Sequence, residues 1–353
     1  MLERLLLVLG GTVVALLALE VGLRVLDVET ASYHSIAGFT VYDPELGWKL
    51  APERTTLFKG AHFSVSVTHN AQGLRDQSYP YEREPGRRRI LVLGDSSVWC
   101  WGVEREDCFT ERLEARLPDT DVINAGVPGY STAQEMIFYE REGRRYRPDL
   151  VLLLMSPNDV ADNVDSRGPR FRLDNGRLAL TNVPVPRRKS RLEQWLQGRS
   201  RLFTYVSYLA TVLARGVASR SSMGEAHAAV LTDQSVEAPG PADSPGTEGE
   251  AWALTAALLE RLDASVRGSG ATLVVLSPVD FEPMRSWIRD VCASRSIAYL
   301  DLAPALWAAD RPGIRLEGDP HFAAAGQEVL TREILAMIAR AHLLPEFPAI
   351  RGR

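Results

Sequence analysis

The chain has 353 residues, 45% of them apolar and 24% charged, so it can bury a sizeable core as one large domain or two smaller ones. Its 45 acidic and 40 basic side chains are spread along the sequence and leave a net charge of -5, which argues against the basic surface that nucleic acid binding requires. The three cysteines and six histidines lie at no metal-ligand spacing, and we predict no metal, no disulfide scaffold and no cofactor.

The N-terminus is predicted to be a membrane anchor over residues 1–27. The segment from Leu5 to Leu26 is mostly apolar and is uncharged apart from Glu20 and Arg24. As a helix it would be about 33 Å long, which matches the hydrocarbon core of a bilayer. Glu20 and Arg24 are four residues apart and can pair on one helical face. We expect a single-pass membrane protein whose remaining chain is extracytoplasmic, with a cleaved signal peptide as the alternative.

Residues 28–85 are predicted to form a small β-rich accessory segment. Apolar and polar residues alternate over Phe63–Val67, as in a strand with one buried face. Turn residues stand at Asp43-Pro44 and at Gly73.

Residues 86–345 show short apolar runs that alternate with longer amphipathic stretches. This pattern predicts an α/β fold, a flavodoxin-like three-layer α/β/α sandwich around a five-stranded parallel sheet. The predicted strands are Ile90–Leu93, Asp121–Asn124, Leu150–Met155, Thr272–Leu276 and Ala298–Leu302. The predicted helices are Asp107–Leu117, Thr132–Tyr146, Trp252–Arg267, Glu282–Ser294 and Ala323–Ala341.

Residues 160–250 are predicted to be an insertion in that domain. Asn175-Gly176 indicates a tight hairpin turn between two strands of Phe171–Leu180. The segment 219–249 has few large apolar residues and is expected to be disordered. An amphipathic helix is expected over Leu192–Ala214, as core packing or, alternatively, as a substrate lid or second membrane contact. Its expected core-facing residues are Trp195, Leu196, Leu202, Phe203 and Tyr205.

Open parallel sheets bind ligands beyond the carboxyl ends of their strands, and four distinctive segments stand at such ends or before the last helix. In chain order they are Gly94-Asp95-Ser96-Ser97, Asn124-Ala125-Gly126, Ser156-Pro157-Asn158-Asp159 and Gly318-Asp319-Pro320-His321. Each segment alone is a common turn. Together, and in this order, they resemble the four sequence blocks of the SGNH/GDSL hydrolases, and the resemblance extends over roughly Arg88–Ala341.

The resemblance implies a role for each matching residue. Ser96 would be the nucleophile and His321 the base that takes its proton. The oxyanion hole would consist of the backbone N–H of Ser96, the backbone N–H of Gly126 and the side-chain amide of Asn158. Ser97 stands where the family has leucine, and Ser156 stands where it has glycine.

The acid of the triad departs from the family pattern, which has aspartate three residues before the histidine, where this chain has Gly318. Asp319 is two residues before His321 and Glu317 is four before it. We expect Asp319 to orient the imidazole, with Glu317 or a backbone carbonyl as alternatives.

Four further residues near the predicted site are expected to be structural. Asp95 and Asp159 would fix their own loops by hydrogen bonds. Trp99 and Trp101 would pack beneath the β-rich segment, with a wall of the substrate pocket as the alternative.

The expected function is therefore hydrolysis of a carboxylic ester through an acyl-enzyme, on a cell-envelope carbohydrate or lipid ester. One alternative is transfer of the acyl group to a polysaccharide or another alcohol by the same residues. A second alternative, from another class, is a catalytically idle binding module at the membrane. The sequence does not indicate an oligomeric state.

Overall fold

The computed structural model describes residues 1–26, 39–60, 62–164, 168–187, 190–197, 199–207, 209–210, 245–309 and 312–344. Its centre is a five-stranded sheet in the order β11-β10-β7-β5-β6 with every neighbouring pair parallel. The strands are β5 (Arg88–Gly94), β6 (Thr120–Gly126), β7 (Leu150–Leu154), β10 (Thr272–Ser277) and β11 (Ala298–Asp301). This is the strand order of flavodoxin-like sheets, so the predicted fold class is confirmed.

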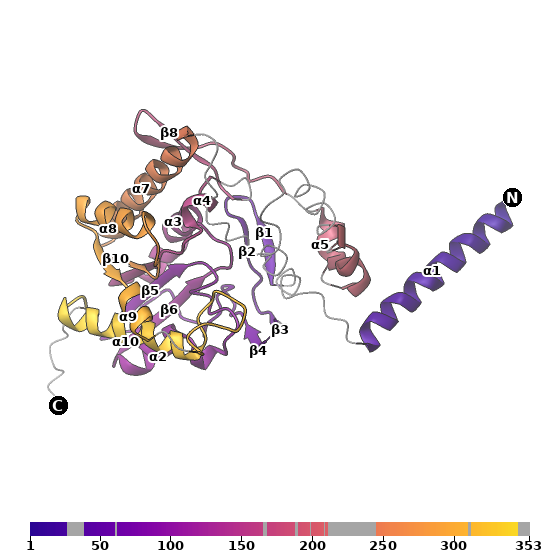
Figure 1. Ribbon diagram of the computed structural model, residues 1–353, viewed down its shortest axis with the longest axis horizontal. Helices are drawn as coiled ribbons and strands as arrows, with labels where there is room; N and C mark the ends of the chain where they lie inside the picture. Colours follow the sequence, from indigo (N-terminus) through magenta and orange to yellow (C-terminus); the bar gives the residue numbers. More distant parts are fainter. Residues whose placement is uncertain are drawn as a thin grey trace.

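Helices cover both faces of the sheet (Figure 1). Alternate residues of β5 belong to two separate apolar clusters, because successive side chains of a strand point to opposite faces. Leu91 and Leu93 pack with α3 (Thr132–Arg141), α7 (Pro245–Gly268) and α8 (Met284–Ser294). Ile90 and Val92 pack with the opposite layer, which consists of α2 (Phe109–Arg116), α9 (Ala303–Ala308) and α10 (Ala324–Arg340). Short 3-10 turns, η3 (Arg105–Asp107) and η4 (Gly143–Tyr146), flank α2 and α3, so the helix predicted over 132–146 is divided.

The carboxyl ends of β6, β5 and β7 lie side by side at one end of the sheet. Gly94 at the end of β5 pairs with Gly126 of β6 on one side and with Leu154 of β7 on the other. A Cβ atom at Gly126 would lie 2.3 Å from the backbone nitrogen of Trp99. Glycine is therefore required at this position, because the turn that follows β5 lies directly against the end of β6.

The predicted β-rich segment consists of two antiparallel hairpins, and we call residues 39–81 the N-terminal module. Its strands are β1 (Thr40–Asp43), β2 (Gly47–Leu50), β3 (Thr55–Lys59) and β4 (Ser64–Thr68). The alternation predicted for β4 is confirmed, since Val65 and Val67 are buried while Ser64 and Ser66 are exposed. Residues 28–38 of the predicted segment lie outside the described residues.

The N-terminal module is joined to the α/β domain by a buried arginine. Arg75 is 1% exposed, and its guanidinium donates hydrogen bonds to the carbonyls of Trp99 at 2.8 Å, Cys100 at 2.5 Å and Val103 at 2.6 Å. Trp99 also donates its indole N–H to His69 of the module, at 3.3 Å. The module thus holds the chain that follows β5.

The insertion begins with α4 (Asp159–Asp162), followed by the antiparallel pair β8 (Phe171–Asp174) and β9 (Arg177–Leu180). Asn175 and Gly176 have φ of 49° and 77°, the left-handed conformation that a two-residue hairpin turn of this type requires. The predicted hairpin is confirmed.

The predicted amphipathic helix is divided into two short helices, α5 (Arg191–Gln197) and a second helical segment over residues 201–207. The expected burial of Trp195 is wrong, because its side chain is 53% exposed. Leu196, Leu202, Phe203 and Tyr205 are half-buried. The hydrogen bonds at Ser200, Arg201 and Leu202 go to Glu20 of the N-terminal helix, which explains why this segment does not pack wholly into the α/β core.

Residues 211–244 lie outside the described residues, and with them most of the segment 219–249 that was expected to be disordered. The last part of that prediction is wrong, because α7 already begins at Pro245. The first turns of α7 are rich in glycine and acidic residues, a composition typical of loops. The sequence pattern therefore did not indicate that the helix begins there.

The N-terminal helix α1 (Leu2–Val25) projects away from the α/β domain (Figure 1). Its stretch Leu6–Val25 has a mean hydropathy of 2.3, and none of it is buried in the protein. Glu20 and Arg24 form the expected ion pair, at 2.7 Å. A helix of this length and composition serves either as a membrane anchor or as a signal sequence.

We expect Arg75→Met to lower the free energy of unfolding by about 3 kcal/mol or more, because three buried carbonyls would each lose a hydrogen bond from a charged donor. Denaturant unfolding followed by tryptophan fluorescence measures this loss. Arg332→Met is the control, since the Arg332 side chain is 60% exposed. Equal stability of the two variants would show that Arg75 does not join the module to the domain.

Candidate active site

Ser96 lies in the turn that leaves the carboxyl end of β5 and is 4% exposed. The turn is held by backbone hydrogen bonds from Trp99 N to Asp95 O, at 3.0 Å, and from Trp101 N to Ser96 O, at 3.1 Å. The Asp95 carboxylate accepts the backbone N–H of Ser97 at 2.9 Å, so Asp95 fixes its own loop as predicted. Ser96 is therefore placed rigidly at the edge of the sheet where parallel strands bind ligands.

The structure brings together three residues that are far apart in the sequence. His321 Nε2 lies 2.7 Å from Ser96 Oγ, and His321 Nδ1 lies 2.5 Å from Asp319 Oδ1. The same carboxylate oxygen accepts the backbone N–H of His321 at 2.9 Å. His321 is 6% exposed, so this hydrogen-bonded chain is largely shielded from water.

Of the two candidate acids, Asp319 faces the imidazole. The Glu317 side chain is 82% exposed, and its carboxylate lies 3.7 Å from His62 Nδ1 instead. Burial alone would raise the pKa of Asp319, but the hydrogen bonds and charge of His321 outweigh it and lower this pKa. Asp319 is thus held in the ionised form that can orient a neighbouring imidazole.

Gly126 and Asn158, which follow strands and were both expected in the oxyanion hole, differ in how their N–H groups are hydrogen-bonded. The backbone N–H of Gly126 donates to Asn124 Oδ1 at 3.0 Å, so in this structure it is already occupied. Asn158 donates one amide hydrogen to Asp162 Oδ2 at 2.7 Å, and within the described residues its second amide hydrogen is left for another acceptor. Gly126 serves the close packing of the serine turn, which the sequence pattern could not distinguish from a donor role.

Gly129, three residues further along the same loop, was not singled out from the sequence. It has a φ of 75°, and its backbone N–H has no acceptor among the described residues. The N-terminal module contacts this loop, because Trp48 donates its indole N–H to Pro128 O at 3.2 Å. The second glycine of Gly126-Val127-Pro128-Gly129 was the sequence signal for a specially shaped backbone here.

A cluster of buried carboxyl groups lies behind the serine loop. Glu135 is 1% exposed and Asp159 is fully buried. Both oxygens of Glu135 lack a hydrogen-bond partner in the described part of the chain, whereas Asp159 accepts the backbone N–H of Ser156 at 2.8 Å. Burial raises the pKa of Glu135 well above its ordinary value, and the negative charge of Asp95 raises it further. Burial likewise raises the pKa of Asp159, with the charges of Glu135 and Asp95 adding to the effect.

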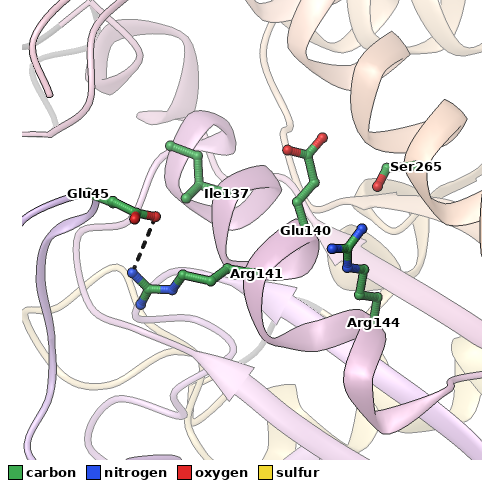
Figure 2. A pocket seen from close by; sticks show the side chains of 6 residues that line it. All are labelled: Glu45, Ile137, Glu140, Arg141, Arg144 and Ser265. Carbon is green, nitrogen blue, oxygen red and sulfur yellow. Dashed lines mark ion pairs between the residues drawn. The ribbon is translucent and has the colours of Figure 1, made fainter.

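A separate hollow of about 320 Å³ lies on the outer side of α3, against α7 (Figure 2). Three of its four charged side chains form ion pairs: Arg141 lies 3.6 Å from Glu45, and Glu140 pairs with Arg261 at 2.7 Å. The lining residues are Glu45, Ile137, Glu140, Arg141, Arg144 and Ser265. None of the predicted site residues lines this hollow, so it does not compete with Ser96 as the reaction centre.

Comparison with protein families agrees with this geometry. A model described as the GDSL-like lipase/acylhydrolase family matches residues 92–329. The matched range is more than half of the chain and includes Ser96, Asn158 and His321. The chain belongs to this family. The resemblance read from the four sequence segments is confirmed, and the protein is an ester hydrolase of the GDSL acylhydrolase class.

Solved structures similar to this GDSL acylhydrolase share little sequence with it. TesA is 15% identical, with a TM-score of 0.42 over 72% of this chain and 99% of TesA. A lipase/acylhydrolase from Enterococcus faecalis is 16% identical, with a TM-score of 0.39 over 74% of this chain and 100% of that one. The esterase EstA from Pseudoalteromonas sp. is 12% identical, with a TM-score of 0.41 over 72% of this chain and 98% of EstA. No curated protein sequence matches this acylhydrolase.

We expect Glu135→Gln to change the pH dependence of stability. The raised pKa means that folded Glu135 keeps its proton at pH values where the unfolded chain, with an ordinary pKa of about 4.3, has lost it. The contribution of Glu135 to stability is therefore complete below the unfolded pKa and declines as the pH rises towards the folded pKa. Relative to the parent, the variant should become progressively more stable in thermal unfolding as the pH rises above about 5. Exposed Glu84→Gln is the control, and parallel curves for parent and Glu135→Gln would contradict the raised pKa.

Proposed function

We propose that this acylhydrolase cleaves carboxylic esters through an acyl-enzyme on Ser96. The observation that supports this proposal is the continuous hydrogen-bonded chain from Ser96 Oγ through His321 to Asp319, with links of 2.7 and 2.5 Å. A serine hydroxyl is a poor nucleophile unless a neighbouring base removes its proton, and this arrangement supplies that base.

In the proposed reaction, Ser96 Oγ attacks the ester carbonyl carbon while its proton moves to His321 Nε2. Asp319 holds the Nδ1 hydrogen and stabilises the imidazolium ion that forms. His321 then gives the proton to the leaving alcohol oxygen as the C–O bond of the ester breaks, which leaves an acyl group on Ser96. Water attacks this acyl group in a second cycle of the same proton transfers, and a carboxylic acid and free Ser96 result.

The negative charge on the tetrahedral oxygen needs donors that are already in place. We propose the backbone N–H of Ser96, the free amide hydrogen of Asn158 and the backbone N–H of Gly129. Gly129 is preferred to the initially expected Gly126, because the Gly126 N–H would first have to leave Asn124. The Gly129 N–H supports this choice, because no described residue accepts a hydrogen bond from it.

The substrate that we propose is an ester of a cell-envelope carbohydrate or lipid. The long apolar helix α1 supports it, because an anchored enzyme works on molecules near the membrane. Transfer of the acyl group to an alcohol acceptor in place of water would use the same residues. The hydrogen-bonded chain at Ser96 supports catalysis rather than an idle binding module.

We further propose that α1 is retained as an anchor, with the catalytic domain extracytoplasmic. Glu20 accepts hydrogen bonds from Ser200 Oγ at 2.9 Å, from Arg201 N at 3.0 Å and from Leu202 N at 2.9 Å. Arg24 donates to the carbonyl of Arg199 at 2.5 Å. Contacts with a segment 175 or more residues away support a helix that remains part of the folded protein.

The central test is p-nitrophenyl acetate and butyrate hydrolysis by the full chain in detergent micelles. Ser96→Ala and His321→Ala should each lower kcat by about 10³-fold or more, and Asp319→Asn by roughly 10²- to 10⁴-fold. Glu317→Gln is the matched control, since this exposed carboxylate faces away from His321. Ser96→Ala with parental activity would refute the proposed mechanism. A stoichiometric burst that turns over only after an alcohol acceptor is added would favour acyl transfer over hydrolysis.

The donors of the oxyanion hole have their own test. Asn158→Ala should lower kcat by about 10²- to 10³-fold with little change in KM, because the lost donor acts mainly on the transition state. Asp162→Asn is the control, since it changes the partner of Asn158 and leaves the amide in place. An Asn158→Ala variant with full kcat would remove this residue from the oxyanion hole.

The retained anchor predicts that the full chain stays in the membrane fraction after a carbonate wash. A double variant, Glu20→Ala with Arg24→Ala, should remain in the membrane while the segment 199–202 becomes more accessible to protease. Release of a soluble protein that begins after residue 26 would instead identify α1 as a cleaved signal sequence.

A further inference from the structure

The ring of Trp101 lies against the ring of His321. The two ring centroids are 5.0 Å apart and the planes are only 14° from parallel. Trp101 is 3% exposed, so its side chain separates this face of the imidazole from water. Its indole N–H is near enough to Asp319 to help lower the pKa of that carboxyl, although it meets no acceptor among the described residues at full hydrogen-bond geometry.

Trp101 is also held in this position by the N-terminal module. Phe58 of the N-terminal module contacts it edge to face, with centroids 4.7 Å apart and planes at 84°. The backbone on either side of Trp101 is fixed as well, because Arg75 donates to the carbonyls of Cys100 and Val103. The indole therefore cannot swing away from His321 unless the module is displaced.

The stacked ring matters most when His321 becomes charged. During attack by Ser96 the imidazole takes up a proton and becomes an imidazolium ion in a site where it is 6% exposed. Burial disfavours that charge, since little water is present to solvate it. The electron-rich face of an indole attracts a cation that lies over it, and the attraction is stronger where water is excluded.

We propose that Trp101 is a positioning residue that fixes the plane of the His321 ring and stabilises its protonated form. Its role in catalysis rests on the proposed function, because it acts through His321. The proposal assigns a role to the N-terminal module, because Phe58 and Arg75 hold Trp101 in contact with His321. It also explains why a tryptophan follows the nucleophile by five residues, which the sequence alone left as packing or pocket wall.

The test compares Trp101→Phe and Trp101→Met with Trp287→Met in the full chain in detergent micelles. Phenylalanine keeps an aromatic face, whereas methionine fills space without one. Trp287 is the matched control, because it is half-buried against Trp252 at the remote helix α8. Circular dichroism and thermal unfolding establish that each variant is folded.

The direct readout is the pKa of His321, from NMR titration of histidine labelled with ¹³C in the ring. The signal is assigned by its loss in His321→Ala. We expect Trp101→Met to lower this pKa by about half a unit, with Trp101→Phe closer to the parent and Trp287→Met unchanged. Identical His321 titrations in the parent and Trp101→Met would overturn the proposal.

The kinetic readout uses p-nitrophenyl acetate over a range of pH. Trp101→Met should lower kcat roughly 3- to 30-fold with KM nearly constant, and its acid limb should move with the His321 pKa. Recovery of most of this loss in Trp101→Phe is expected, whereas equal losses in both variants with an unmoved acid limb would mean that Trp101 only fills space. The NMR titration needs no catalysis, so an inactive parent would count against the proposed function and still decide whether Trp101 stabilises protonated His321.

Discussion

The structure depends on the close packing of one short turn. The chain from Asp95 to Val103 leaves the central strand β5, lies against the end of β6 at Gly126 and is covered on its other side by the N-terminal module. Three backbone carbonyls of this turn have no partner in a sheet or helix, and the buried Arg75 supplies donors to all of them. A buried carbonyl without a donor is costly, so the module and the α/β domain stabilise each other through this contact.

The same packing gives the carboxyl groups around Ser96 two different environments, one that lowers the pKa and one that raises it. Asp319 is partly exposed and bonded to His321, and its pKa is lowered. Glu135 and Asp159 are buried close to other acids, and burial raises the pKa of each. The ionised carboxylate therefore lies beside His321, the proposed base, where it would stabilise a positive charge. Glu135 and Asp159, behind the loop, keep their protons more readily, which would avoid several negative charges near the proposed oxyanion hole.

Much of the site could be predicted from local sequence because each part follows a strand. Glycine and small polar residues after apolar runs mark the carboxyl ends of β5, β6 and β7, and parallel pairing brings these ends together. The choice between Asp319 and Glu317 depends on which side chain turns towards the imidazole, and no spacing rule determines that. The expected burial of Trp195 was wrong because periodicity identifies an amphipathic helix and does not identify what covers it.

The sequence by itself determined the α/β class, the five strands, the apolar N-terminal helix and the family, since these depend on periodicity and on short segments in a set order. Tertiary structure alone decided that Gly126 packs against the serine turn while the Gly129 N–H meets no acceptor in the described part of the chain. It also decided that Trp101 lies on His321 and that the buried carboxyl of Glu135 has no hydrogen-bond partner among the residues that the structure describes. These features are contacts between segments up to 220 residues apart in the sequence. They form because these segments pack together at the same end of the sheet, and no local sequence pattern encodes that packing.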